Sequence, residues 1–206
     1  MKILAKDVRM SFNDLYQAKA VNDGDPKFSI TAICSDATKL KVTNADGEKV
    51  LLDHSKMKNL IDKVLIEKLG KVPAKFKNWA YCKADGSYGA REEYTDKNGD
   101  WWGGFDENTF YISASKRGDK APNGIQVIDQ GRETIEANSG KLFSGCYVNL
   151  ILDLYAIESK TGVSVQFSLE AVQLLRKGEP LGISQVDAKN EFDEEEADEV
   201  TTEDFM

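Results

Sequence analysis

The chain has 206 residues and a formal net charge of −8, a length that suits one packed domain with appendages. Residues 187–206 hold ten acids and one base, which is −9, so residues 1–186 carry only +1. No run of about 18 apolar residues occurs, and charged residues at positions 2, 6, 7 and 9 leave no room for a signal peptide. Composition therefore predicts a soluble, intracellular protein that crosses no membrane, with a near-neutral body (1–186) and an acidic end (187–206).

The first third of the chain predicts strands. Residues 8–20 have scattered apolar positions without helical spacing, which indicates an irregular strand, and residues 22–26 form a Gly- and Pro-containing turn. Residues 28–34 alternate apolar and polar side chains, as a strand with one dry face does. Residues 40–43 and 50–52, joined across 44–47, predict a hairpin.

One helix is predicted over residues 55–69, where apolar side chains recur at three and four positions and lysines occupy the opposite side. Ser55 is the expected N-cap, and Gly70 the expected stop. The lysine side is interpreted as a solvated face, with a nucleic-acid contact as the alternative.

The rest of the body returns to strands after a long irregular stretch, residues 71–108, that contains several glycines. Alternation then predicts strands at 110–115 and 125–129, and a long antiparallel hairpin made by 145–157 and 163–174. The expected fold is all-β with one main helix, an antiparallel barrel with a long aromatic-rich insertion. Residues 187–206 have too few bulky apolar side chains to offset the entropy of ordering, so we expect a disordered acidic tail.

Residues for catalysis or metal binding are scarce. His54 is the one histidine, and the cysteines at 34, 82 and 146 are odd in number and form no CxxC pair, so we expect buried, reduced thiols. No GxxxxGK[ST] phosphate loop occurs. A metal-dependent nuclease would need carboxylates on adjacent strand ends, for which Asp106, Asp129 and Asp153 are the candidates. Their spacing does not favour a cluster, so we predict no enzyme, no metal and no cofactor, and keep the nuclease as an alternative.

Aromatic residues concentrate in one window. All three tryptophans fall within residues 79–102, and residues 75–120 contain ten of the nineteen aromatics, interleaved with eight lysines and arginines. Rings beside cations suit single-stranded nucleic acid, because unpaired bases stack on rings and cations follow phosphates. The window also holds eight acids, and a glycine-rich segment can use its aromatics as a small core of its own. Both interpretations stay open at this level.

Four blocks of sequence together resemble phage-encoded single-stranded DNA-binding proteins with an acidic tail. The blocks are FYISASKRGDKAPNGIQVID at 110–129, SGCYVNLILDLYAIESKTGVSVQFSLEAVQLLRKGEPLG at 144–182, VRMSFNDLYQAKAVNDGDPKFSITAIC at 8–34, and EDF at 203–205. The resemblance implies an OB barrel that coats single-stranded DNA in phage replication and recombination, in the cytoplasm of the infected bacterium. A phage structural or adaptor protein is the further alternative.

The resemblance also suggests roles for particular positions. The strand with Tyr111, Lys116 and Arg117 resembles part of the family's binding face, as do Ser113 and Ser115 within it. The end residues Glu203, Asp204 and Phe205 resemble its partner-recruiting tip, which implies contacts with phage or host replication proteins. Met206 departs from the family pattern, which tends to end on the Phe.

The predicted interface combines both lines of reasoning. Base stacking is expected from two or three of the rings, and phosphate contacts from the cations. The predicted residues are Trp79, Tyr81, Arg91, Trp101, Trp102, Tyr111, Lys116 and Arg117. Binding is expected to be independent of sequence. The acidic tail is expected to compete with DNA for the same surface, so that its removal raises affinity and permits binding to duplex DNA.

Overall fold

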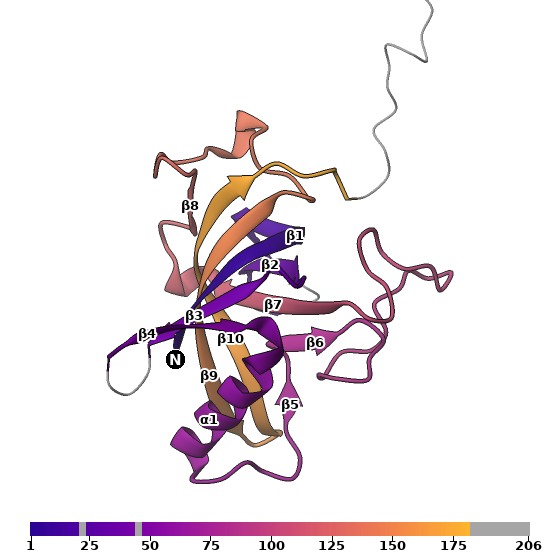
Figure 1. The fold of residues 1–206 in the computed structure, drawn as a ribbon, viewed down its shortest axis with the longest axis vertical. Helices are drawn as coiled ribbons and strands as arrows, with labels where there is room; N and C mark the ends of the chain where they lie inside the picture. Colours follow the sequence, from indigo (N-terminus) through magenta and orange to yellow (C-terminus); the bar gives the residue numbers. More distant parts are fainter. Residues whose placement is uncertain (21–23, 44–46, 182–206) are drawn as a thin grey trace, which may run out of the picture.

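The computed structural model describes residues 1–20, 24–43 and 47–181 (Figure 1). Three predictions therefore lie outside the described residues: the disorder of the acidic tail, the tip at Glu203, Asp204 and Phe205, and the boundary at residue 186. Parts of the turns at 22–26 and 44–47 lie outside them as well.

Five strands close a barrel. They are β1 (Lys2–Lys19), β2 (Lys27–Ile33), β7 (Phe110–Arg117), β10 (Gly162–Arg176) and β9 (Tyr147–Ser159), in the order β2-β7-β10-β9-β1. The additional pairing of β2 with β1 closes the ring, and β7 with β10 is the parallel pair among antiparallel ones. This is the OB arrangement, so the predicted fold class is confirmed.

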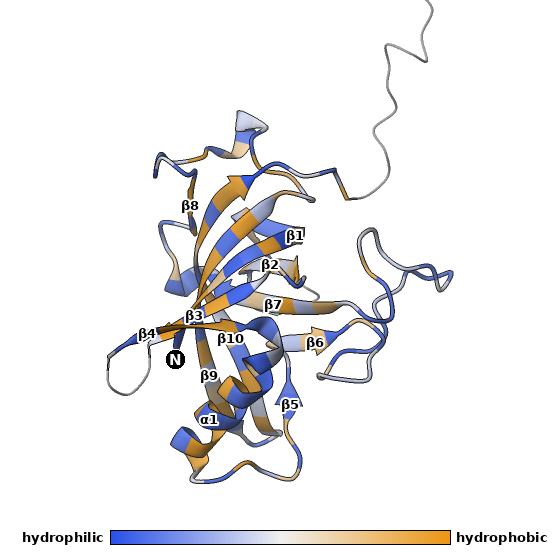
Figure 2. Ribbon diagram, in the orientation of Figure 1, coloured by the Kyte–Doolittle hydropathy of each residue, from blue (hydrophilic) through white to orange (hydrophobic). Residues whose placement is uncertain are grey.

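The long hairpin β9–β10 supplies much of the core by simple alternation. Val148, Leu150, Leu152 and Leu154 point inward and are fully buried, while Ile151 and Asp153 between them stay partly exposed. On β10, Val165, Phe167 and Leu169 do the same. Figure 2 shows the resulting change between hydrophilic and hydrophobic residues along these strands. Period-two patterning is the signal from which the sequence predicted both strands.

β1 bends in its middle and so serves two parts of the sheet. Its first residues pair with β3 (Lys39–Thr43) as well as with β9, and its later residues pair with β2. The bend lies at Asp7, which has φ 57°, within a register shift between Ala5 and Val8. The Asp7 carboxylate lies 2.8 Å from the Arg176 guanidinium at the end of β10. β3 forms the predicted hairpin with β4 (Lys49–Asp53), at the sheet edge.

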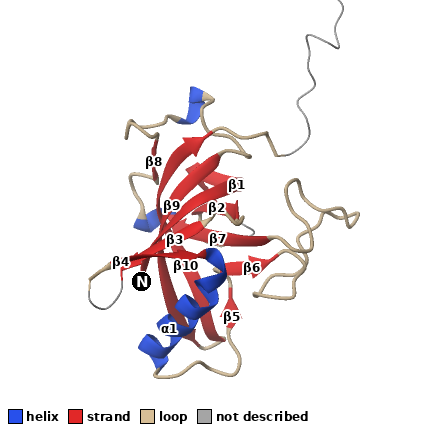
Figure 3. Cartoon of the chain, viewed as in Figure 1, coloured by secondary structure: helices blue, strands red, loops and turns tan. Residues whose placement is uncertain are grey.

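The helix α1 (Met57–Leu69) follows a single 3-10 turn, η1 (His54–Lys56) (Figure 3). The predicted N-cap was wrong: Lys56 takes that position, no side chain caps the helix, and Ser55 lies inside the 3-10 turn. The predicted stop is confirmed, because Gly70 adopts φ 74° and its N–H donates to the Ile66 carbonyl. The buried side of α1 packs into the main core, through Met57, Leu60, Ile61, Val64 and Leu65.

The predicted irregular stretch contains two short strands, β5 (Lys77–Asn78) and β6 (Tyr81–Lys83), before a loop at 84–109. This loop extends to one side of the barrel in Figure 1. A second core cluster under it comprises Ile33, Cys82, Ala84, Phe105 and Tyr111, with Tyr94, Trp101 and Leu181 packed against it. The remaining elements are η2 (Gly118–Lys120), β8 (Gln126–Ile128), which pairs with β10, and η3 (Ala137–Ser139).

Two further expectations can be compared with the structure. The three cysteines are free and buried, as predicted. None of the helices in the described part of the chain is long and apolar enough to span a membrane.

His54 provides a test of the packing between η1 and β6. Its Nδ1 lies 2.7 Å from the Tyr81 hydroxyl, and burial lowers its pKa below the ordinary value of 6.5. Because the unfolded chain then takes up the proton first as pH falls, the free energy of unfolding should decrease from pH 7.5 to pH 5.5. Denaturant unfolding at several pH values measures this slope. Carboxyls with a lowered pKa, such as Asp85 at about 2, change the free energy of unfolding only below this pH window, because their pKa values in the unfolded chain lie near 4.

The matched variant is His54→Gln, which keeps a polar group beside Tyr81 without a titration near neutral pH. Its unfolding free energy should be flat across the same window. A slope that persists in His54→Gln would show that another group is responsible.

Candidate nucleic-acid interface

Two adjoining hollows form a groove across the outside of the barrel. The first, of about 300 Å³, lies between Trp79, Arg91 and the strands β7 and β10. The second, of about 230 Å³, continues over β7, η2, β10 and β9. They share Lys27, Ser115 and Gln166, so we treat them as one feature, the outer groove. Register explains the continuity, because Lys27 pairs with Arg117, and Gln166 pairs with Tyr155.

The outer groove is cationic. Its lining contains five basic side chains and no acidic one among the described residues: Lys27, Arg91, Lys116, Arg117 and Lys120. The described part of the chain places no carboxylate within ion-pair distance of Lys27, Arg91 or Lys120. These three cations are therefore available to an anionic ligand.

The other two cations already have partners. Lys116 forms an ion pair with Glu170 of β10, and Arg117 contacts Asp119 at 2.9 Å and Asp25 at 3.2 Å. Burial opposes ionisation of Glu170, but hydrogen bonds from Lys116 and Ser168 hold its pKa below the ordinary value. The predicted residues Lys116 and Arg117 do line the groove. Much of their positive charge is neutralised by the carboxylates of these ion pairs.

Trp79 and Arg91 form one wall of the groove. Trp79 follows β5 and is fixed by its backbone N–H, which donates to the Val165 carbonyl at 2.9 Å. The Arg91 guanidinium lies 5.9 Å from the centre of the Trp79 ring and donates to the Ser113 hydroxyl at 3.0 Å. Trp79 is partly exposed and Arg91 is exposed. In such a pair the flat ring can stack on a base while the cation contacts the neighbouring phosphate.

A second aromatic feature lies farther along the same outer surface. Trp102 and Phe12 are 42 % and 43 % exposed, and their rings meet edge to face at 5.5 Å. Tyr94 supports Phe12 at 5.9 Å and packs on Tyr111, two positions before Ser113 on β7. We call Phe12, Tyr94 and Trp102 the aromatic patch. Between Ser115 and Tyr111, β7 spans roughly 13 Å at 3.3 Å per residue, so the patch and the outer groove are neighbours.

Three predicted rings are less available to DNA. Tyr111 is fully buried and Tyr81 is 1 % exposed, with Tyr81 stacked on Phe110 at 5.2 Å. Burial raises the pKa of both hydroxyls. These two side chains stabilise the barrel wall and offer no ring to a base. Trp101 is partly buried against the second core cluster. The core interpretation of the window thus accounts for these three, and the stacking interpretation is left with Trp79 and Trp102.

The sequence missed Lys27, Lys120 and Phe12. Lys27 begins β2 and Lys120 ends η2, and only the pairing of β2 with β7 brings them to the groove. Phe12 was counted among the apolar residues of an irregular strand, but a register shift between Met10 and Asn13 accompanies its outward position. Such bulges re-aim side chains. The alternation of Val8, Met10 and Phe12 with polar residues is unbroken in the sequence, so it carried no signal that Phe12 is exposed.

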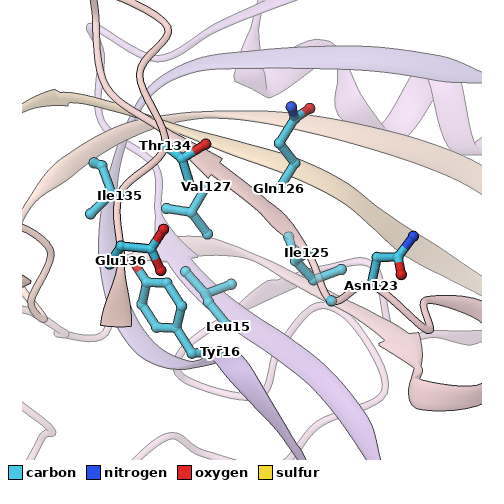
Figure 4. A pocket seen from close by; sticks show the side chains of 10 residues that line it. Leu15, Tyr16, Asn123, Ile125, Gln126, Val127, Thr134, Ile135 and Glu136 are labelled. Carbon is cyan, nitrogen blue, oxygen red and sulfur yellow. The ribbon is translucent and has the colours of Figure 1, made fainter. Parts of the chain in front are cut away.

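A larger hollow, of about 430 Å³, lies elsewhere, between the end of β1, β8 and residues 134–136 (Figure 4). Its lining contains Tyr16 and Glu136 and no basic side chain. Burial and the neighbouring Glu136 carboxylate raise the pKa of the Tyr16 hydroxyl. A surface with an acid and no cation repels phosphates, so this hollow is a poor nucleic-acid site despite its size.

The carboxylates of the nuclease alternative have separate partners. Asp106 accepts hydrogen bonds within its own turn, Asp129 accepts from the Glu133 N–H, and Asp153 binds the N-terminal ammonium at 2.8 Å. No three His, Cys, Asp or Glu side chains in the described ranges are grouped as a metal site. The structure therefore gives the nuclease alternative no support.

Comparisons with known proteins identify the family of this chain. The family model described as Enterobacter phage Enc34, ssDNA-binding protein, matches residues 1–205. The putative protein p50 of Acyrthosiphon pisum secondary endosymbiont phage 1 is 27 % identical over 197 residues, which cover 94 % of each chain.

Solved structures show the same fold. The single-stranded DNA-binding protein from bacteriophage Enc34 has a TM-score of 0.56 and 19 % identity over 93 % of this chain and 90 % of that one. The same protein in complex with ssDNA has a TM-score of 0.56 and 20 % identity over 88 % and 89 %. Since the family model spans nearly every residue, the chain belongs to the family of the Enterobacter phage Enc34 single-stranded DNA-binding protein.

Proposed function

We propose that this protein binds single-stranded DNA, independently of sequence, across the outer groove and the aromatic patch. The observation that carries the proposal is the juxtaposition of the Trp79 ring, the Arg91 guanidinium, Lys27 and Lys120 along one barrel face. Neither lysine has an ion-pair partner in the part of the chain that the structure describes. Family membership and the solved relative in complex with ssDNA support it.

The strand's bases would stack on Trp79 at one end and on the Phe12–Trp102 pair at the other. Each stacked base contributes about 1–3 kcal/mol, with little preference among bases. The groove floor offers hydroxyl and amide groups from Ser113, Ser115 and Gln166, which hydrogen-bond to many partners. This chemistry suits a protein that coats whatever sequence is exposed.

The acidic tail would compete with DNA for the outer groove. Residues 187–206 carry −9, and a polyanion is what the groove's cations attract. Leu181, the last described residue, packs against the second core cluster, and its N–H donates to the Ser144 carbonyl at 2.9 Å. The 25 residues beyond it have a contour length of roughly 80 Å, enough to reach the groove from there.

The wider role follows from these contacts. We place the protein in the cytoplasm of the infected bacterium, as a non-enzymatic factor of phage replication and recombination. Residues 1–186 form the DNA-binding domain and residues 187–206 the regulatory tail, whose Glu203, Asp204 and Phe205 recruit phage or host replication proteins. No cofactor takes part.

Replacing the stacking rings tests the path of the strand. Trp79→Ala and Trp102→Ala should each weaken binding to oligothymidine by about 5- to 150-fold, because one stacked base is lost. Fluorescence anisotropy of labelled oligonucleotide measures the affinity. Tyr16→Ala is the matched control, since Tyr16 is an exposed aromatic in the hollow without cations. Equal affinity for all three variants and the parent would contradict the proposed path.

Salt dependence tests the phosphate contacts. Lys27→Ala and Arg91→Ala should each reduce the slope of log K against log salt by about 0.7, since one counterion-releasing contact disappears. Lys71→Ala, at an exposed lysine beyond α1, should leave the slope unchanged. If Lys71→Ala lowers the slope as much as the groove variants do, binding depends on overall charge and not on the groove.

Removal of residues 187–206 tests the competition. The truncated protein carries +1 where the full chain carries −8, so its affinity for single strands at low salt should rise and weak duplex binding should appear. A full-length variant with tail acids replaced by their amides separates charge from length and should behave like the truncation. Unchanged affinity in both would leave the tail without a role in DNA binding.

A further inference from the structure

The free edge of strand β4 is a second surface with a definite chemical pattern. β4 is the last strand in the sheet order and pairs with β3 through five consecutive residue pairs without a register shift. Within the described residues no strand pairs with its other side. Figure 1 shows the β3–β4 hairpin extending to one side of the barrel. An open edge presents unpaired backbone donors and acceptors to another strand.

Edge strands often carry features that prevent such pairing, and β4 is short with a charged residue at each end, Lys49 and Asp53. These two charges are opposite, so a second copy of the strand can pair them with each other. β4 contains no proline and no bulge. Leu51, at its centre, is 56 % exposed, the highest value among the exposed large hydrophobic residues of the described chain. An exposed leucine at the middle of a regular edge favours burial by a partner.

The sequence of β4 is complementary to itself in the antiparallel direction. It reads Lys49, Val50, Leu51, Leu52, Asp53. If a second copy pairs antiparallel with the centre at Leu51, Lys49 faces the second copy's Asp53, Val50 faces its Leu52, and Leu51 faces its Leu51. Opposite charges and apolar pairs placed directly across strands stabilise a sheet, whereas like charges destabilise it.

We propose that β4 pairs with β4 of a second copy of this chain, joining two barrels through a continuous sheet. Each Asp53 then lies between Lys39 of its own β3, with which it already forms an ion pair, and Lys49 of the other copy. The two Leu51 side chains cover each other. The contact is the same patch on both copies, so it closes as a twofold dimer and does not extend into a filament.

The proposal is independent of DNA binding, because β4 contributes no residue to the outer groove. The pairing involves five residues on each copy, so we expect a dimer that dissociates on dilution. Sedimentation velocity of the full-length protein over a wide concentration range, without DNA, should show a reversible change from monomer to dimer and no larger species.

Charge exchange provides the decisive variants. Lys49→Asp places two acids opposite two acids in the pair, and Asp53→Lys places two bases opposite two bases. Each variant alone should dimerise at least about tenfold more weakly than the parent, and an equimolar mixture of the two should recover dimers, because the mixed pair is again complementary. Only a direct antiparallel contact between these positions predicts recovery on mixing.

Leu51→Asp offers a second measurement that does not disturb the Lys39–Asp53 pair. Within one copy the new acid would face Lys41 of β3, with which Leu51 is paired, whereas in the dimer two acids would meet. The variant should fold as the parent does, by circular dichroism and thermal unfolding, and should remain monomeric. Lys71→Asp, the same charge change as Lys49→Asp at a distant exposed site, should dimerise like the parent. A parent that stays monomeric at every concentration, or mixed charge variants that recover no dimer, would overturn the proposal.

Discussion

The pairing of β1 with strands on both of its sides is the constraint on which the molecule depends. Its first residues hydrogen-bond to β9 and β3, and its later residues to β2, so one strand closes the barrel and also carries the β3–β4 hairpin. The change of direction is concentrated at Asp7, where a positive φ is combined with a register shift. Aspartate tolerates this conformation better than most side chains. The contacts of Asp7 with Arg176 and Asn149 tie the bend to β10 and β9.

Closure of the barrel determines where the functional groups appear. Because β2, β7 and β10 are neighbours in the ring, side chains from distant parts of the sequence reach one outer face. Lys27, Arg91 and Lys120 come together there without an ion-pair partner among the described residues, while Lys116 and Arg117 form ion pairs with Glu170, Asp25 and Asp119. The net charge of the body is close to zero, so attraction for a polyanion comes from the local arrangement of charge.

The aromatic-rich window serves two purposes. Tyr81, Tyr111 and Phe105 are buried and build the wall and the second core cluster, on which the 84–109 loop lies. With that support the loop can hold Trp102 against Phe12 at the surface, and Arg91 against Trp79. The buried rings hold the exposed rings in place. Less side-chain conformational entropy would therefore be lost if a DNA strand bound to them. The core interpretation of the window holds for the buried rings, and base stacking remains our proposal for the exposed Trp102 and the partly exposed Trp79.

The sequence by itself determined the features that depend on near neighbours in the chain. Alternation located the strands of the long hairpin, three-and-four spacing located α1, and Gly70 marked its end, because side-chain periodicity follows directly from backbone geometry. It also predicted Trp79 and Arg91 as nucleic-acid contacts, from composition in one window, and both side chains line the outer groove. Tertiary structure alone decided which aromatic side chains are buried, which cations are unpaired, and that Lys27, Lys120 and Phe12 join the same face. These outcomes depend on strand register and on one bulge in β1, and a register that pairs residue 27 with residue 117 leaves no mark in the local sequence.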